Sequence, residues 1–77
     1  MSSRIYKKLA RARNYMRDAY QEPIQLADIS AEANLSPYHF QRTYKKSYGE
    51  TPHEFLTRLR IDRAKTLLVH LGWRVYR

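Results

Sequence analysis

The sequence contains no cysteine, only two glycines and three prolines, and no long hydrophobic run. Without cysteine, neither disulfide bonds nor thiolate metal ligands can stabilise the chain, and a reducing cytoplasm is its natural setting. The scarcity of proline and glycine, together with weak strand signals, favours an all-α fold. The longest apolar run is far too short to span a bilayer, and the N-terminus lacks the apolar core of a signal peptide.

Acidic residues are also few, since seven Asp and Glu stand against fifteen Lys and Arg and give a formal charge of +8. Such an excess favours a polyanionic partner, with nucleic acid first and an anionic membrane surface second. The 77 residues are enough for one small domain. A chain of this size buries only about 60–65% of its unfolded surface, so its core is thin.

No group of catalytic or metal-binding side chains is evident. The three histidines, His39, His53 and His70, are scattered, and neither paired carboxylates nor a nucleophile accompanies them. Their spacing matches no metal-binding motif. We therefore expect that the protein is not an enzyme and that it has no cofactor, no metal ion and no small-molecule ligand.

Residues 4–20 predict an amphipathic helix. Apolar side chains recur at helical spacing and form one stripe: Ile5, Leu9, Ala12, Met16, Ala19 and Tyr20. Basic side chains occupy the other side: Arg4, Lys7, Lys8 and Arg11, with Arg13 and Arg17 on one flank. This basic face is either simply solvated or contacts nucleic acid, and in both cases it adds to the field that attracts phosphate. Pro23 ends the helix because it disfavours a helical conformation at Glu22.

Two short helices joined by a three-residue turn follow. The first runs from about residue 26 to 33, and its inward-facing residues are Leu26, Ile29 and Ala33. Asn34 tolerates the left-handed backbone that ends a helix, Ser36 is a strong N-cap, and Pro37 suits the first helical position. This arrangement over about residues 26–47 is the helix-turn-helix pattern, whose second helix enters the major groove of DNA.

The second of these helices, residues 37–47, has two chemically different faces. At roughly 100° per residue, one side carries Phe40, Thr43, Tyr44 and Ser47. The other side carries Tyr38, Gln41, Arg42 and Lys45, flanked by His39 and Lys46. A solvated polar face would have the same pattern. However, Gln can pair with adenine, Arg with guanine, and an aromatic edge can contact a thymine methyl group, so with the turn and the charge we predict DNA binding.

A long fourth helix is expected over about residues 52–71. Thr51 and Glu54 form a capping box with Pro52 at the first helical position, and Gly49 and Gly72 are stops before and after the helix. Its apolar surface is wide: Phe55, Leu56, Leu59, Ile61, Ala64, Leu67, Leu68 and Leu71. We expect one side to pack on the first three helices and some apolar surface to remain. That surface and the tail are candidate dimer contacts, namely Leu68, Leu71, Trp73, Val75 and Tyr76, unless the tail folds back on its own core.

Several short motifs keep a common order and spacing along the chain. They are Pro23 through Leu26, Asp28-Ile29, Ala33 through Pro37, His39 through Arg42, Tyr44 through Lys46, Gly49, Thr51-Pro52, Leu59 through Ile61, Arg63-Ala64 and Leu67-Leu68. Together, from about Tyr6 to Leu68, they resemble the first half of the DNA-binding domain of the AraC/XylS family of bacterial transcription regulators. In that family two helix-turn-helix units are joined by a long helix, which corresponds here to residues 51–71.

The resemblance implies a homeodomain-like four-helix unit in which residues 1–77 form a single helix-turn-helix domain, half of the family's two-unit domain. It implies base-reading positions at Tyr38, Gln41 and Arg42. We assign contacts with the DNA backbone to Ser36, His39, Lys45 and Lys46. The sequence departs from the family's pattern at three positions. Gln25 stands where a small hydroxyl residue usually caps the second helix. Asn34 stands where glycine is usual, and Thr43 replaces a usually aliphatic residue.

We therefore predict a sequence-specific, DNA-binding transcription regulator located in the cytoplasm, with double-stranded DNA as its partner. A membrane partner is not expected, because the caps and turns describe a packed domain. The sequence holds one reading unit, and a second tethered unit can raise affinity by factors of about 10²–10⁴. A homodimer would supply the second reading unit and with it this gain in affinity. The alternative is a protein-interaction module that pairs with a full-length regulator and modulates it.

Overall fold

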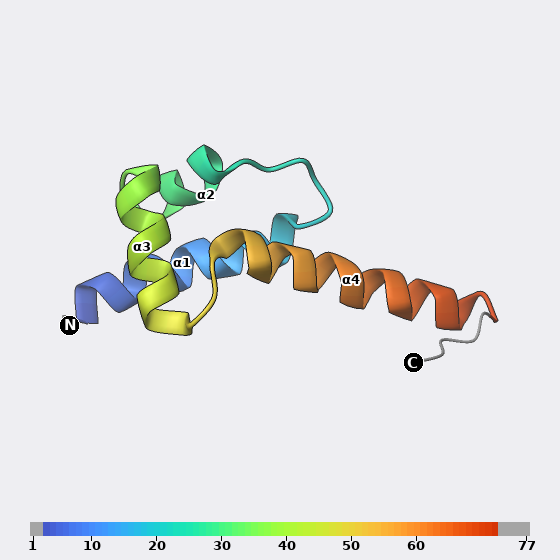
Figure 1. The fold of residues 1–77 in the computed structure, drawn as a ribbon. Coiled ribbons are helices and arrows are strands. Elements are labelled where there is room, and N and C mark those ends of the chain that lie inside the picture. The colour runs from blue at the N-terminus through green and yellow to red at the C-terminus, as the bar shows by residue number, and fades with distance from the viewer. Residues whose placement is uncertain (1–2, 73–77) are drawn as a thin grey trace.

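A computed structural model describes residues 3–72 and contains four helices in this range (Figure 1). The helices are α1 (Ser3–Ala19), α2 (Leu26–Glu32), α3 (Pro37–Tyr48) and α4 (Pro52–His70). No strand occurs among the described residues. The predicted all-α class is confirmed, and every helix end lies within one residue of its predicted position.

The turn between α2 and α3 has the predicted chemistry. Asn34 adopts a left-handed conformation with φ of 54°, and the chain then reverses into α3. The Ser36 hydroxyl accepts a hydrogen bond from the backbone N–H of His39 at 3.3 Å, so one of the unpaired donors of the first turn is satisfied. Gly49 ends α3 with φ of 77°, a conformation that suits glycine.

The capping box at the start of α4 is present in both directions. The Thr51 hydroxyl accepts from the Glu54 N–H at 3.1 Å, and the Thr51 N–H donates to the Glu54 carboxylate at 2.8 Å. The hydrogen bond from the Thr51 backbone holds the pKa of Glu54 below its usual value. At the start of α2, where Gln25 replaces the usual small hydroxyl residue, the Asp28 carboxylate accepts a hydrogen bond from the backbone N–H of Gln25 at 2.9 Å.

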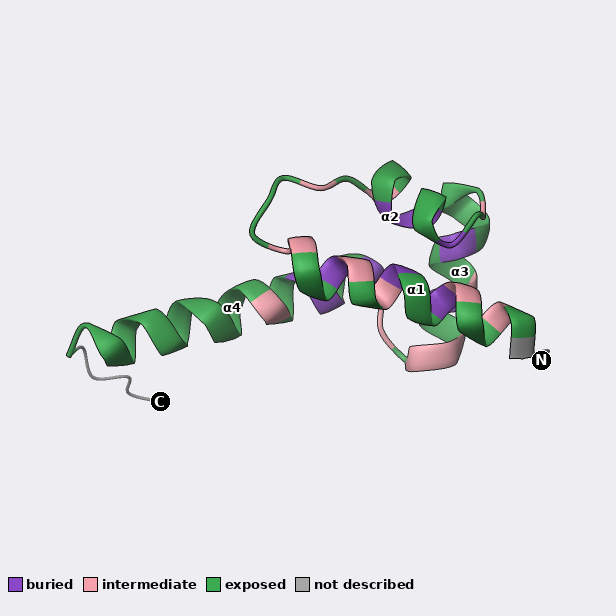
Figure 2. Ribbon diagram, turned by 180° about the vertical axis from the view of Figure 1, so that it is seen from behind, coloured by how far each residue is buried: buried purple, intermediate pink, exposed green. Residues whose placement is uncertain are grey.

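The core lies where α1, α2, α3 and the first turns of α4 meet (Figure 2). Its buried apolar residues are Leu9, Ala12, Met16, Ile29, Ala33, Phe40, Tyr44, Phe55 and Leu56. Tyr44 is central, with ring centroids 5.6 Å from Phe40, 4.6 Å from Tyr48 and 6.4 Å from Phe55. The side of α3 that was predicted to face inward is therefore the side that fixes this helix to the body.

Arg13 does not belong to a solvated basic face. Its guanidinium lies between two aromatic rings, 4.4 Å from the centroid of Tyr48 and 4.5 Å from that of Phe55. The Glu50 carboxylate lies 3.8 Å from Arg13 and 2.6 Å from Arg58. The prediction for Arg13 was wrong because these partners follow it by more than thirty positions in the sequence. Arg13 thus ties α1 to the end of α3 and the start of α4.

The distal half of α4 extends away from the three-helix body, and the protein measures 46 × 22 × 18 Å (Figures 1 and 2). Only Pro52, Phe55 and Leu56 of this helix are buried, and every residue from Arg60 to His70 is exposed. Arg60 lies where α4 leaves the three-helix body and links the helix to the segment after α1. Its Nε donates a hydrogen bond to the Tyr20 carbonyl at 2.8 Å, and its Nη2 donates one to the Glu22 carbonyl at 3.1 Å. Exposed apolar side chains therefore remain on the distal half of α4, namely Ile61, Leu67, Leu68 and Val69.

Candidate nucleic-acid interface

The outer face of α3 carries the side chains that the sequence analysis assigned to base reading. Tyr38 is 72% exposed, and Gln41 and Arg42 are exposed as well. Phe40 and Tyr44 lie on the opposite side of the same helix at 0% exposure. Because the inner face is held by aromatic packing, the outer face is presented on a fixed backbone.

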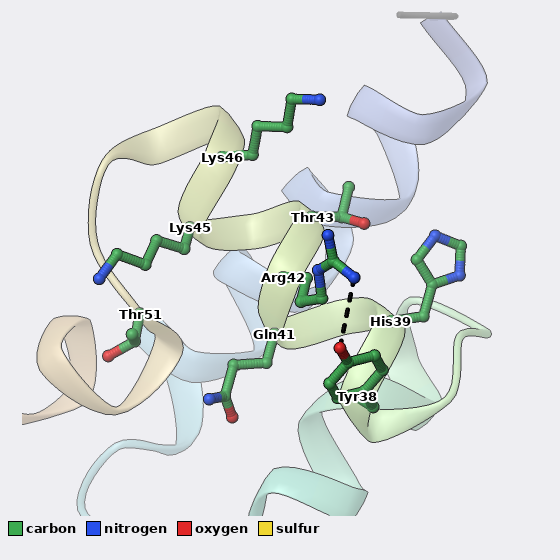
Figure 3. A pocket seen from close by; sticks show the side chains of 8 residues that line it. All are labelled: Tyr38, His39, Gln41, Arg42, Thr43, Lys45, Lys46 and Thr51. Carbon is green, nitrogen blue, oxygen red and sulfur yellow. Dashed lines mark hydrogen bonds between the residues drawn. The ribbon is translucent and has the colours of Figure 1, made fainter.

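A shallow groove runs over this face, and Figure 3 shows the side chains that line it. They are Tyr38, His39, Gln41, Arg42, Thr43, Lys45, Lys46 and Thr51. Tyr38 and Arg42 lie together on α3, while Gln41 and Lys45 extend on one side of them and His39 on the other (Figure 3). Three lining residues are basic and none is acidic, so the groove suits an anionic partner.

Arg42 is held by Tyr38 within this groove. Arg42 Nη1 donates a hydrogen bond to the Tyr38 hydroxyl at 3.3 Å, and the guanidinium carbon lies 5.6 Å from the centroid of the Tyr38 ring. Residues four apart are neighbours on a helix surface, and long side chains point back toward the N-terminus, which brings Arg42 over Tyr38. The contact is drawn as a dashed line in Figure 3.

The groove differs from the predicted set in three positions. Ser36 is exposed and caps α3, but it is not among the lining residues. Thr43 and Thr51 line the groove and were assigned only to packing and capping. Thr43 follows His39 by four positions, a helical spacing that was available in the sequence. No local pattern indicated Thr51, because the turn at Gly49 is what returns the chain to the edge of α3.

The predicted dimer contacts fall into two groups. Leu68 is 40% exposed on the distal part of α4, and Leu71, the C-cap directly after this helix, is 73% exposed. They lie near three further exposed apolar residues of the same helix: Ile61, Leu67 and Val69. Trp73, Val75 and Tyr76 lie outside the described residues. The apolar surface expected on α4 is therefore present.

No cluster of three or more His, Cys, Asp or Glu side chains suited to a metal ion occurs between residues 3 and 72. Within the same range, none of the helices combines the length and the apolar character needed to cross a membrane.

Residues 16–57 match the family described as bacterial regulatory helix-turn-helix proteins, AraC family. The chain belongs to this family. The matched residues of this AraC-family chain include all of α2 and α3 and end within α4, before its distal half. The AraC family is one of transcription regulators and not a class of enzymes.

Individual relatives agree with this assignment. The chain is 29% identical to the lactose operon transcription activator of Staphylococcus xylosus over 86% of its own length and 24% of that protein. It is 36% identical to the probable transcriptional regulator LumQ of Photobacterium leiognathi, over 71% of this chain and 22% of LumQ. For the regulatory protein PocR of Salmonella typhimurium the identity is 29%, over 88% of this chain and 22% of PocR. The chain thus spans less than a quarter of each of these relatives, and no solved structure matches it.

Proposed function

We propose that this chain binds double-stranded DNA sequence-specifically, as a reading unit of a transcription regulator. The observation that carries the proposal is the outer face of α3, where Tyr38, Gln41 and Arg42 project from a helix anchored by Phe40 and Tyr44. An α-helix fits the major groove of B-DNA, and in a helix-turn-helix the second helix occupies it. Membership of the AraC family favours this function over the alternative of a module that only pairs with other proteins.

The roles follow from the donors and acceptors of each side chain. The Arg42 guanidinium suits the O6 and N7 acceptors of guanine, and the Gln41 amide suits the N6 and N7 of adenine. The Tyr38 ring can contact a thymine methyl group. Contacts with the DNA backbone are proposed for Ser36, His39, Lys45 and Lys46. The proposed function requires no catalysis and no cofactor, and we propose that the protein acts in the cytoplasm.

The test of this proposal compares a base contact with a phosphate contact. Arg42→Ala should cost about 1–3 kcal/mol of binding free energy and relax the preference at one base position, because a bidentate pair is lost. Lys46→Ala should weaken binding to all sequences alike and reduce the slope of affinity against salt by about one. Selection from random duplex DNA, repeated at two salt concentrations, measures both effects.

Both variants remove a cation from an exposed position on one helix, so each is the charge-matched control for the other. If the two substitutions changed affinity, salt slope and sequence preference in the same way, the assigned roles would be wrong. If the unmodified chain selected no sequence, the proposed function itself would fail.

We also propose that two copies associate through the distal half of α4, which would bring two reading helices to one DNA site. The support is the exposed apolar surface on this part of the helix and at its C-cap, including Leu68 and Leu71. Pairing with a full-length regulator through the same surface is the second possibility. Alanine at Gln41 and Arg42 separates regulation through DNA binding from inhibition of a partner regulator, because it would abolish activity that depends on DNA and leave inhibition of a partner intact.

Sedimentation should show dimers at high micromolar concentration, and Leu68→Glu should shift them toward monomers. Thr57→Glu adds the same charge at another exposed position of α4 and is the matched control. Added salt should strengthen this association, because it screens the repulsion between two chains of charge +8, while it weakens DNA binding. A strict monomer at these concentrations would rule out the homodimer.

A further inference from the structure

The contact between Tyr38 and Arg42 gives Tyr38 a role that its position on the helix does not indicate by itself. We infer that Tyr38 is a positioning residue, whose hydroxyl group holds the Arg42 guanidinium in the orientation that reads a base. This inference rests on the proposed DNA binding and specifies how the α3 face achieves its specificity. It differs from an independent contact between Tyr38 and the DNA.

Two observations place the guanidinium beside the phenol group. The hydrogen bond from Arg42 Nη1 to the Tyr38 hydroxyl measures 3.3 Å, and the ring centroid lies 5.6 Å from the guanidinium carbon, within the range of cation–π attraction. Tyr38 itself is 72% exposed and is fixed to α3 by only two side-chain torsions. The phenol therefore provides a short, stiff support on the solvent side of the helix.

The remaining donors of Arg42 stay available. A guanidinium has five N–H groups, and the bond to Tyr38 uses one of them. A bidentate pair with guanine needs two. The contact with Tyr38 thus orients the Arg42 guanidinium and leaves free the N–H donors that would recognise the base.

The contact with Tyr38 is expected to improve base discrimination by holding Arg42 in its bound geometry before DNA binds. A free arginine side chain loses rotamer freedom when it binds, and a side chain held in its bound geometry loses less. By this argument, removal of the Tyr38 hydroxyl should reduce discrimination at the Arg42 base position by a factor of about two to ten. Non-specific affinity should stay unchanged, because the contacts with phosphate groups do not involve this pair.

The experiment is a double-mutant cycle of Tyr38→Phe and Arg42→Ala. Each variant is measured against the selected duplex and against duplexes altered at single base pairs. Phenylalanine keeps the ring and its contact with a thymine methyl, so the substitution isolates the hydroxyl. Tyr38→Phe should lower discrimination only at the base pair identified by Arg42→Ala, and it should have no further effect in the Arg42→Ala background. Tyr6→Phe, at a 49% exposed tyrosine of α1, is the matched control.

Two results would overturn the inference. One is a loss of preference at a different base pair, which would make Tyr38 an independent reader. The other is full retention of discrimination in Tyr38→Phe. Relaxation of the Arg42 Nε–H signal in the protein without DNA adds a separate measurement, in which Tyr38→Phe should increase the side-chain motion. Failure of the proposed function would leave this measurement unchanged and would appear as the absence of any sequence preference in the unmodified chain.

Discussion

Phe40→Ala should lower the free energy of unfolding by about 3–5 kcal/mol, the cost of removing a fully buried aromatic ring. Phe40 is at 0% exposure, and its ring packs at a tilt against that of Tyr44 in the core. A domain of 77 residues has a total stability of roughly 4–12 kcal/mol, so this single change removes a large part of it. The loss should also abolish DNA binding, because the reading face of α3 is held by the ring beneath it.

Urea unfolding followed by circular dichroism measures the effect. Tyr38→Ala is the matched control, since it truncates an aromatic residue of the same helix that is 72% exposed. Surface substitutions of this kind usually stay within about 0.5 kcal/mol. Equal losses of stability in the two variants would mean that α3 is not anchored by its Phe40 face.

The helix boundaries were predictable because they are encoded locally. Thr51 and Glu54 cap α4 within one turn, and Ser36 caps α3 over three residues. Asn34 and Gly49 supply the left-handed conformations that end the preceding helices. Each signal involves residues a few positions apart, so its outcome depends little on the rest of the fold.

Contacts between distant segments were not predictable in the same way. Arg60 bonds to the carbonyls of Tyr20 and Glu22, about forty positions earlier, and Arg13 lies between Tyr48 and Phe55. In the sequence these arginines look like any other basic residue of an amphipathic helix. Only the crossing of α1, α3 and α4 makes them structural, so a count of basic residues overestimates the charge that is free to meet DNA.

The candidate site could be predicted from the sequence only in part. The helical spacing of residues in α3 predicted which side chains point outward, because the buried positions of Phe40 and Tyr44 fix the rotation of the helix about its axis. It could not predict that Arg42 bonds to Tyr38, since the same spacing also permits both side chains to extend separately into solvent. The sequence therefore predicted which face of α3 is exposed and which side chains it carries. It did not predict which of these side chains contact each other.

Joining two copies of the chain should raise affinity for a site with two copies of the selected sequence by a factor of about 10²–10⁴. The two copies would bind successive major grooves, which lie about 34 Å apart on one side of the duplex. A Gly/Ser linker of about 40 residues has a root-mean-square span of about 35 Å, close to that separation. Titration at low nanomolar protein keeps spontaneous association of separate chains out of the measurement.

The informative control is a tandem protein in which Gln41 and Arg42 of the second copy are both alanine. This protein keeps Lys45, Lys46 and the other proposed phosphate contacts of both copies, and the loss of one positive charge should weaken its non-specific binding only slightly. It should lose most of the gain at the double site, because only one α3 can then read a sequence. An equal gain in both tandem proteins would show that charge alone accounts for the affinity, and the outer face of α3 would no longer explain recognition.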